Sequence, residues 1–204
     1  MKSIENVLLS FKKKKDESNI ITHTIIPNKD NKLFKYGCSF SVPDDNIKEF
    51  YECLHTYLFN DKLQLSLTES FQDNCPLMFD LDIKYENKNK IRIYNDKEVH
   101  NLVKLIWKNI TKYFSIDTNI DNYDECWITE KEEPFYSELD NTNYNIKDGL
   151  HIIYPNIIGD RKVFKEFMKL FTEREIIDDL NNIFENKPSN ELSSIFDTNV
   201  QRWF

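Results

Sequence analysis

The clearest pattern of hydrophobic and polar positions lies between Pro76 and Lys84. The odd-numbered positions are all apolar: Leu77, Phe79, Leu81 and Ile83. The even-numbered positions hold Met78, Asp80, Asp82 and Lys84. Successive side chains on a strand point to opposite faces, so this segment is predicted to be a strand that is buried on one side. Its other side carries two carboxylates about 7 Å apart along the strand.

Hydrophobic periodicity along the rest of the chain predicts short strands that alternate with helices. Apolar residues at helical spacing predict helices over residues 4–11, 45–58, 96–114 and 161–171, and an amphipathic segment over 176–184. Alternating or β-branched runs predict strands over residues 18–27, 32–42, 63–69, 125–130, 149–155 and 193–200. Residues 28–31 are expected to form a turn, 85–94 a hairpin and 131–147 a long polar loop. This mixture without a repeat is typical of mixed α/β or α+β proteins.

Length and composition favour a globular chain of one large domain or two lobes. The 204 residues include 40% hydrophobic residues, and only 3 glycines and 6 prolines leave little room for linkers. No apolar run approaches the roughly 20 residues that span a bilayer, so we expect a soluble intracellular protein. The four cysteines lack C-x-x-C spacing, which favours ordinary thiols in a reducing compartment over a zinc site or disulfides.

The acidic pair on the predicted strand is the first candidate site. Asp80 and Asp82 repel one another unless positive charge lies near them, and hard carboxylate ligands suit Mg²⁺ or Mn²⁺. An amphipathic strand whose acids simply face water explains the same pattern equally well. The net charge of −8 argues against a simple basic nucleic-acid surface, but a metal site of a polymerase must itself be acidic.

Two further stretches carry candidate residues. His151 follows Gly149 on a predicted strand, where a glycine allows a ligand or backbone to come close. Asp197 follows the apolar pair Ile195 and Phe196. The sequence contains neither the Gly-rich loop of P-loop ATPases nor the G-x-G-x-x-G pattern of dinucleotide sites, which excludes those two classes.

Taken in order, Asp-x-Asp, small-x-His and hydrophobic-Asp resemble the archaeo-eukaryotic primase superfamily. The resemblance is strongest to the primase-polymerase domain at the N-terminus of helicase-primases of large DNA viruses, and Lys35-Tyr36 fits the same pattern. It implies an α+β fold: an RRM-like catalytic sheet with flanking helices, plus an N-terminal α/β lobe. The lobes of this single domain would cover roughly residues 1–70 and 71–204.

The resemblance also implies a metal-dependent nucleotidyltransferase, a DNA primase or primase-polymerase of viral DNA replication. Asp80, Asp82 and Asp197 would hold two Mg²⁺ or Mn²⁺ ions, with no zinc, and His151 would contact the phosphates of the incoming nucleotide. The implied partners are nucleoside triphosphates, a single-stranded or primed DNA template and a helicase domain in the same polypeptide, with no membrane. The implied location is a viral replication compartment in the host cytoplasm.

Two departures keep other functions open. Gln201 stands where the family usually has an aromatic residue, and the chain ends at Phe204, where the family continues with basic residues and a helicase. A fragment, a trimmed version or a degenerate copy is therefore expected. The alternatives are a catalytically degenerate module that binds nucleic acid or a partner with the same fold, and a metal-dependent nuclease or replication initiator.

Overall fold

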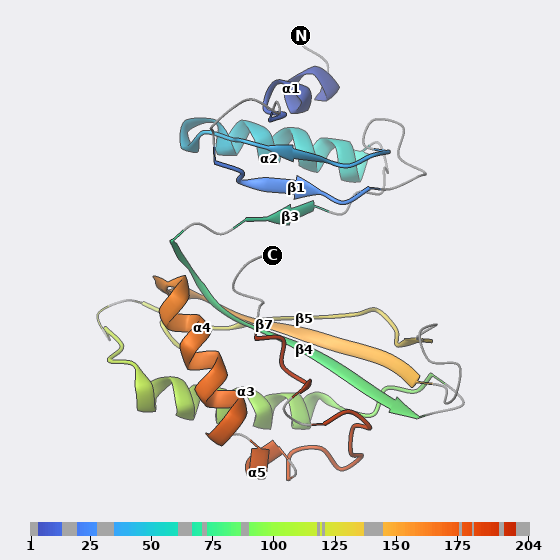
Figure 1. Cartoon of the computed structure of the whole chain (residues 1–204), viewed down its shortest axis with the longest axis vertical. Helices are drawn as coiled ribbons and strands as arrows, with labels where there is room; N and C mark the ends of the chain where they lie inside the picture. The colour runs from blue at the N-terminus through green and yellow to red at the C-terminus, as the bar shows by residue number, and fades with distance from the viewer. Residues whose placement is uncertain are drawn as a thin grey trace. The chain divides into compact units, whose positions relative to one another are not determined.

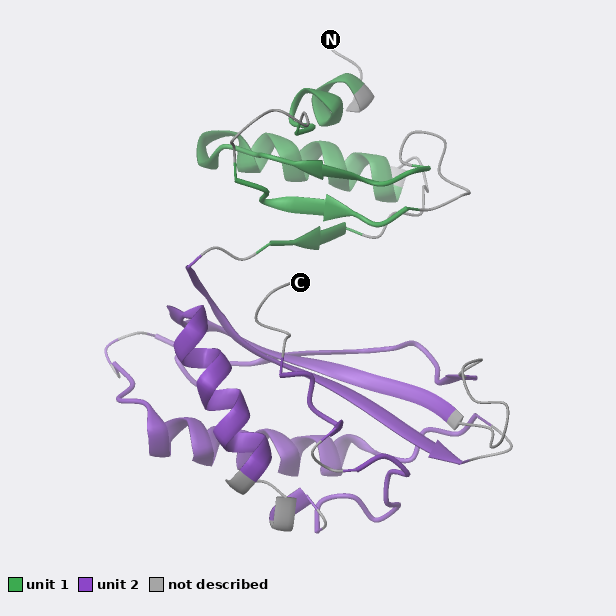
Figure 2. Cartoon of the chain, viewed as in Figure 1, with its two compact units in different colours: residues 1–72, 202–204 green, residues 73–201 purple. Residues whose placement is uncertain are grey.

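The computed structural model divides the chain into two compact units, one built from residues 1–72 and one from residues 73–201 (Figure 2). It describes residues 4–13, 20–27, 35–60, 67–70, 73–86, 90–117, 119, 121–136, 145–175, 177–180, 182–191 and 194–198. That the two units act as lobes of one primase-polymerase-like domain stays a prediction.

The first unit is a small antiparallel sheet with helices (Figure 1). Its helical elements are α1 (Ile4–Ser10), the 3₁₀ turn η1 (Asp44–Asn46), α2 (Ile47–His55) and the π turn η2 (Thr56–Asn60). Its strands are β1 (His23–Ile25), β2 (Cys38–Phe40) and β3 (Leu67–Glu69), in the order β2-β1-β3. The predicted pairing of the first two strands is confirmed, although both are shorter than predicted. The predicted turn over residues 28–31 lies outside the described residues.

A histidine is buried in the core of this unit. His23 lies against the Phe50 ring, and its Nδ1 and Nε2 atoms are each 2.9 Å from a hydroxyl oxygen, of Thr22 and Tyr51 respectively. Burial lowers the pKa of His23 because an imidazolium loses hydration inside the protein. The ring therefore favours the neutral form, which accepts a hydrogen bond at one nitrogen and donates a hydrogen bond from the other.

The second unit begins with the element order β–α–β–β–β–α. Its strands are β4 (Asn74–Glu86), β5 (Trp127–Glu130), β6 (Phe135–Tyr136) and β7 (Asn145–Asp160), and its helices are α3 (Asp96–Tyr113), α4 (Arg161–Leu170), the π turn η3 (Phe171–Glu175) and α5 (Ile177–Leu180). The antiparallel sheet runs β4-β7-β5, with β6 also on β7. Phe196 bridges Leu81 in antiparallel fashion, which adds a final extended segment. When the two-residue β6 and the four-residue α5 are not counted, the order is the β–α–β–β–α–β of ferredoxin-like domains.

The apolar face of β4 is the centre of the core, as its alternation predicted. Leu77, Phe79, Leu81 and Ile83 are all fully buried. The Phe79 ring makes edge contacts with Tyr154 of β7 and Phe167 of α4. Trp107 of α3 stacks on the same Tyr154 ring, so both helices pack against one face of the sheet. The fold class is α+β, and the opposite face of the sheet is the one that carries the acids.

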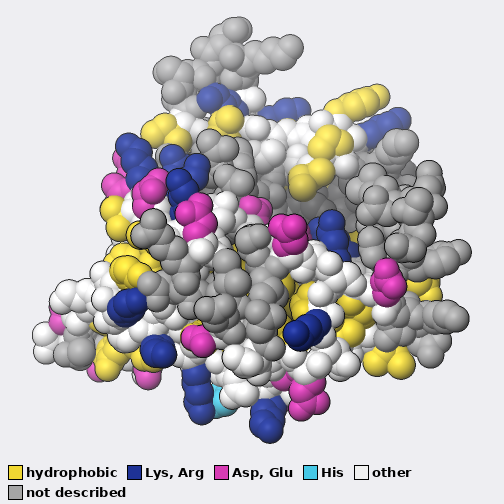
Figure 3. All heavy atoms as spheres, turned by 60° about the horizontal axis from the view of Figure 1, so that its bottom comes forward, with side chains coloured by type: hydrophobic (Ala, Val, Ile, Leu, Met, Phe, Trp, Pro, Cys, Tyr) yellow, Lys and Arg dark blue, Asp and Glu magenta, His cyan; other side chains and the backbone are white. Residues whose placement is uncertain are grey.

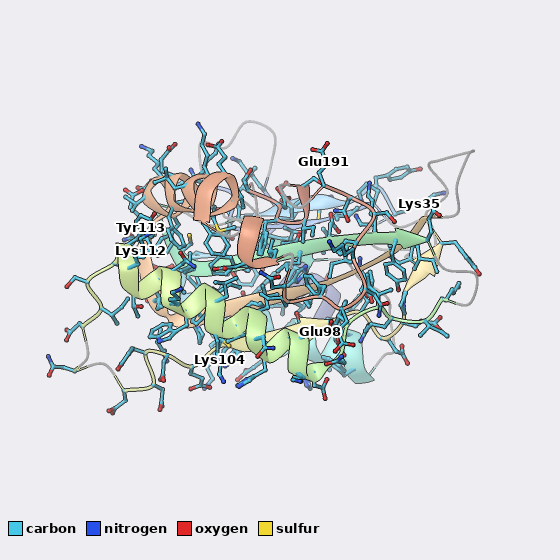
Figure 4. The ribbon with its side chains drawn as sticks, turned by 90° about the horizontal axis from the view of Figure 1, so that it is seen from below. Lys35, Glu98, Lys104, Lys112, Tyr113 and Glu191 are labelled. Atoms are coloured by element: carbon cyan, nitrogen blue, oxygen red, sulfur yellow. The ribbon has the colours of Figure 1, made fainter. Side chains whose placement is uncertain are left out.

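The two long helices begin at the residues that their capping signals indicate. Asn95 caps α3 and forms a capping box with Glu98, whose other carboxylate oxygen accepts a hydrogen bond from the Glu185 amide. Asp160 caps α4 through the Lys162 amide. Figure 4 shows Glu98 near the beginning of α3 and Tyr113 at its end. On the side that carries α3 and α5, Lys and Arg side chains are mixed with Asp and Glu (Figure 3).

Several local predictions are wrong. Of the predicted hairpin over residues 85–94, residues 85 and 86 belong instead to β4, which pairs with β7, and the described residues 90–94 contain no strand. The predicted loop over 131–147 contains β6 and the beginning of β7. Met78 is buried on the acid-bearing face of β4. Of the predicted strand over 193–200, the described part shows a bridge at Phe196.

Two predictions that concern chemical class can also be compared with the structure. All four cysteines, Cys38, Cys53, Cys75 and Cys126, are free thiols, as predicted. Among the residues that the structure describes, no helix is both long and apolar enough to cross a membrane.

Candidate functional site

The register between β4 and β7 brings two of the sequence motifs face to face. Asp80 lies directly opposite His151, and Asp82 lies opposite Gly149. Residues directly opposite one another in an antiparallel pair point to the same face of the sheet. The His151 Nε2 atom is 3.2 Å from the Asp80 Oδ1 atom, so the two form an ion pair whenever the imidazole is protonated.

Lys147 supplies the positive charge that the acidic pair requires. Its Nζ atom lies 2.9 Å from the Asp82 Oδ1 atom, and both side chains are partly exposed. Sequence reasoning missed this residue, although its signal was present. Lys147, Gly149 and His151 are spaced by two, which places all three on one face of a strand. The charge on the strand is therefore partly balanced by β7 itself.

The third motif reaches the same place from the far edge of β4. The Asp197 amide donates to the Asp80 carbonyl oxygen at 2.9 Å, and the Asp82 amide donates to the Ile195 carbonyl at 2.7 Å. Between them, the buried Phe196 side chain packs against the Phe79 and Phe171 rings. This register places Asp197 opposite Asp80, on the same face.

The Asn190 side chain anchors the residues just before this segment to β4. The Asn190 Nδ2 atom donates to the Asp82 carbonyl oxygen at 3.0 Å, and its Oδ1 atom accepts from the Lys84 amide at 2.9 Å. The Ser189 amide also donates to the Lys84 carbonyl at 2.7 Å. The amide side chain thus takes the place of a peptide group in the β ladder and fixes the chain to β4 before Asp197 is reached.

Three of the four residues that the sequence predicted, Asp80, Asp82 and His151, line a cavity of about 330 Å³ in the second unit. The cavity is lined by Asp80, Leu81, Asp82, Thr129, Glu130, Lys131, Lys147, Gly149, Leu150 and His151. Asp80 and Asp82 are 27% and 37% exposed, so both carboxylates remain accessible to a ligand. Asp197 is exposed on the neighbouring segment but does not line this cavity.

The floor of the cavity depends on Gly149. A Cβ atom at this position would overlap the Leu81 carbonyl oxygen of the facing strand. The prediction that a glycine here allows a close approach is therefore correct, and the approaching group is the backbone of β4.

An ion network lies on the other face of the sheet, beneath the cavity. The Arg92 Nε atom donates to the fully buried Asp148 at 2.9 Å, and its Nη1 atom lies 2.6 Å from Glu130. Burial acts to lower the pKa of Arg92, but the hydrogen bond and charge of Asp148 outweigh it and raise that pKa. Arg92 and Asp148 are 56 positions apart in the sequence, so no local sequence pattern predicts their contact. The network fixes the end of β5 against β7.

The acids are not arranged as a preformed metal site. Among the described residues, no group of three His, Cys, Asp or Glu side chains is gathered closely enough to hold a metal ion. Asp80 and Asp82 instead face His151 and Lys147. The donor chemistry still fits a hard divalent cation, because three carboxylates share one face and two of them line an accessible cavity. Gln201 lies outside the residues that the structure describes.

Comparison with known proteins identifies the group to which this arrangement belongs. Residues 30–203 match the family described as "C962R protein N-terminal AEP domain", where AEP denotes archaeo-eukaryotic primase. A protein of Acanthamoeba polyphaga mimivirus, named "Putative helicase L207/L206", is 29% identical over 170 residues. The aligned region covers 81% of this chain and 16% of that relative, so the chain spans a small part of the relative's length. The family match covers most of the chain, and the protein therefore belongs to the archaeo-eukaryotic primase family.

Proposed function

We propose that this primase-like domain is a metal-dependent nucleotidyltransferase, a DNA primase or primase-polymerase that acts in viral DNA replication. The observation that supports it most strongly is the convergence of three distant motifs. Asp80, His151 and Asp197 come from three adjacent segments of one sheet, and antiparallel register places them on one face. Family membership supports the proposed reaction class, and the shared face supports the choice of residues.

In this proposal Asp80, Asp82 and Asp197 hold one or two Mg²⁺ or Mn²⁺ ions. Such ions neutralise a triphosphate and lower the pKa of an attacking 3′-hydroxyl. His151 and Lys147 provide hydrogen-bond donors for phosphate oxygens on the same wall of the cavity. Each of these side chains now contacts an acid, so ligand binding exchanges partners: a carboxylate takes a cation, and the freed donor takes a phosphate.

The proposed ligands are nucleoside triphosphates and a single-stranded or primed DNA template. A helicase domain in the same polypeptide is proposed because the mimivirus relative carries that name and is much longer than this chain. The proposed setting is a viral replication compartment in the host cytoplasm.

One observation favours a second candidate, a binding module that has lost catalysis. The acids pair with Lys147 and His151, and the described residues include no three-ligand metal cluster. In this alternative the ion pairs are permanent and hold the sheet face together. The net charge of −8 and the residue Gln201 agree with weakened function.

Primer extension separates the two candidates. We expect weak extension of a labelled primed template with Mn²⁺ at low salt, lost in Asp80→Ala and retained in Glu86→Gln, a variant on the same strand outside the cavity. Absence of product from the parent chain, with single-strand binding unaffected by Asp80→Ala, would favour the binding module.

Lys147→Met tests the exchange of partners directly. The substitution keeps an apolar stem and removes the cation that competes for Asp82. An enzyme site should bind Mn²⁺ more tightly and nucleoside triphosphate more weakly in this variant. His151→Ala should also weaken triphosphate binding with little loss of stability, because the side chain is 42% exposed. Unchanged affinity for both ligands in Lys147→Met would contradict the proposed exchange.

A further inference from the structure

Two exposed aromatic side chains lie beside the candidate site and have no part in the proposed chemistry. Trp127 of β5 is 55% exposed, and Phe135 of β6 is 42% exposed. Trp127 lies opposite Ile153 of β7, and Phe135 lies opposite Lys147. Because Lys147, His151 and Ile153 alternate along β7, both aromatic rings lie on the face that carries the acids.

Polar and cationic side chains separate the two rings. Thr129 lies opposite His151 and lines the cavity. Lys131 also lines the cavity, and its Nζ atom lies 4.8 Å from the centroid of the Phe135 ring. Along this edge the sheet therefore presents an aromatic ring, a hydroxyl, an ammonium group and a second aromatic ring. Aromatic rings interleaved with basic side chains are the pattern that binds single-stranded nucleic acid.

The positions of the rings distinguish them from core aromatics. Trp107, by contrast, is stacked on the buried Tyr154 ring under α3. Sheets of the RRM type stack bases on aromatic side chains of their own face. Here the two adjacent strands β4 and β7 use the centre of that face for Asp80 and His151, and the exposed rings lie at its edge.

The charges along the edge indicate which part of a nucleic acid is contacted. Glu130 also borders the cavity, but its carboxylate is already paired with Arg92 at 2.6 Å. Glu132 and Glu133 are exposed next to Lys131 and disfavour a long run of phosphates. Base stacking does not depend on the backbone charge, so the ligand is held chiefly by its bases, with one phosphate contact at Lys131.

We propose that Trp127 and Phe135 form a stacking site for the bases of a single-stranded nucleic acid, with Lys131 on its backbone. The β7 partners of the two rings are six residues apart, which separates the rings by about 20 Å, so they contact different bases. The site leads a strand along the edge of the sheet to the Asp80–His151 cavity. Only this destination rests on the proposed function; the stacking site stands without catalysis.

Equilibrium binding to two labelled 12-mers tests the site: oligo-dT, and an abasic strand of equal charge. Trp127→Ala and Phe135→Leu should each weaken oligo-dT binding about fivefold or more, with abasic binding unchanged. Phe135→Leu keeps apolar bulk but removes the ring. Tyr136→Ala is the matched control, because Tyr136 is 44% exposed on the opposite face of the same strand, and it should bind like the parent. Lys131→Gln should reduce the dependence of affinity on salt by about one phosphate contact.

Equal effects of the aromatic substitutions on both oligonucleotides, or no effect on either, would overturn the stacking site. Melting temperatures identify any variant that fails to fold, and Trp127→Phe then replaces Trp127→Ala, with binding near that of the parent expected for stacking. The Asp80→Asn, Asp82→Asn double variant should bind oligo-dT like the parent. If the protein extends no primer but the aromatic substitutions weaken oligo-dT binding as expected, only the proposed function is refuted. If the protein extends a primer but the aromatic substitutions have no base-dependent effect on binding, only the stacking site is refuted.

Discussion

Removing the Asn190 side chain should loosen the segment that brings Asp197 to the candidate site. Asn190→Ala deletes the donor to the Asp82 carbonyl and the acceptor of the Lys84 amide. A net hydrogen bond contributes about 0.5–1.5 kcal/mol, so two of them set a range of about 1–3 kcal/mol. Because Asn190 is only half-buried, water replaces part of the loss. We expect the free energy of unfolding to fall by about 1–2 kcal/mol.

Urea denaturation measures this loss, and amide hydrogen exchange locates it. The Lys84 and Asp197 amides should exchange faster in Asn190→Ala, because one loses its acceptor and the other depends on the segment that Asn190 anchors. In Asn190→Asp a carboxylate still accepts from the Lys84 amide but cannot donate to the Asp82 carbonyl. Exchange at Lys84 should therefore stay slow in that variant.

Glu191→Ala is the matched control for Asn190→Ala. The Glu191 side chain points out from the ribbon and is exposed (Figure 4), and its backbone carbonyl accepts from Ser194 independently of that side chain. Such a surface substitution should change stability by less than about 0.5 kcal/mol. If Asn190→Ala is no less stable than Glu191→Ala, and the Lys84 amide remains protected from exchange, the two hydrogen bonds of the Asn190 side chain do not anchor this segment to β4.

Three further outcomes are expected. Saturating Mn²⁺ should raise the melting temperature by several degrees, since a ligand at 100 times its Kd stabilises the folded state by about 2.7 kcal/mol; an equal rise in the Asp80→Asn, Asp82→Asn double variant would exclude this metal site. Gly149→Ala should destabilise the second unit by about 1–3 kcal/mol in urea denaturation, because the added Cβ overlaps the facing backbone; wild-type stability would contradict that overlap. Because the pKa of His23 is lowered in the folded state, the unfolded chain binds a proton at His23 more readily than the folded chain does. The contribution of neutral His23 to stability is therefore complete above about pH 6.5 and is lost as the pH falls below that value. His23→Gln should flatten the stability profile between about pH 7.5 and 5.5, and an unchanged slope would refute the assignment.

The sequence predicts those parts of the fold that depend only on residues close together in the chain. The apolar side of β4, the beginning of α3 and the Asp160 cap each follow from residues within a few positions. The hairpin over residues 85–94 was wrong because two neighbouring apolar runs do not reveal their partners. β4 pairs with a strand about 70 residues later, and only the tertiary fold decides between that partner and a nearby one.

The candidate site shows the same division between local and distant information. Asp80, Asp82 and His151 stand out because alternation exposes them on single strands. The meeting of Asp80 with His151, and of both with Asp197, depends on two antiparallel registers that no local pattern fixes. Asn190 carries no sequence signal, since a lone asparagine in a polar segment is ordinary. Its role becomes visible only when its amide is seen within the ladder beside β4.

The chain itself supplies a positive partner for the acidic pair of β4. Two carboxylates on one strand face favour nearby positive charge, and the chain provides it through Lys147, whose Nζ atom lies 2.9 Å from Asp82 Oδ1; His151 lies 3.2 Å from Asp80 Oδ1. A carboxylate oxygen that pairs with an ammonium group cannot bind a cation at the same position. Under the proposed function, metal binding at Asp82 would release Lys147 into the cavity, where it could contact a phosphate. Cation and triphosphate should then bind cooperatively, because the cation binds the Asp82 carboxylate that Lys147 leaves and the triphosphate binds the Lys147 ammonium group that Asp82 leaves.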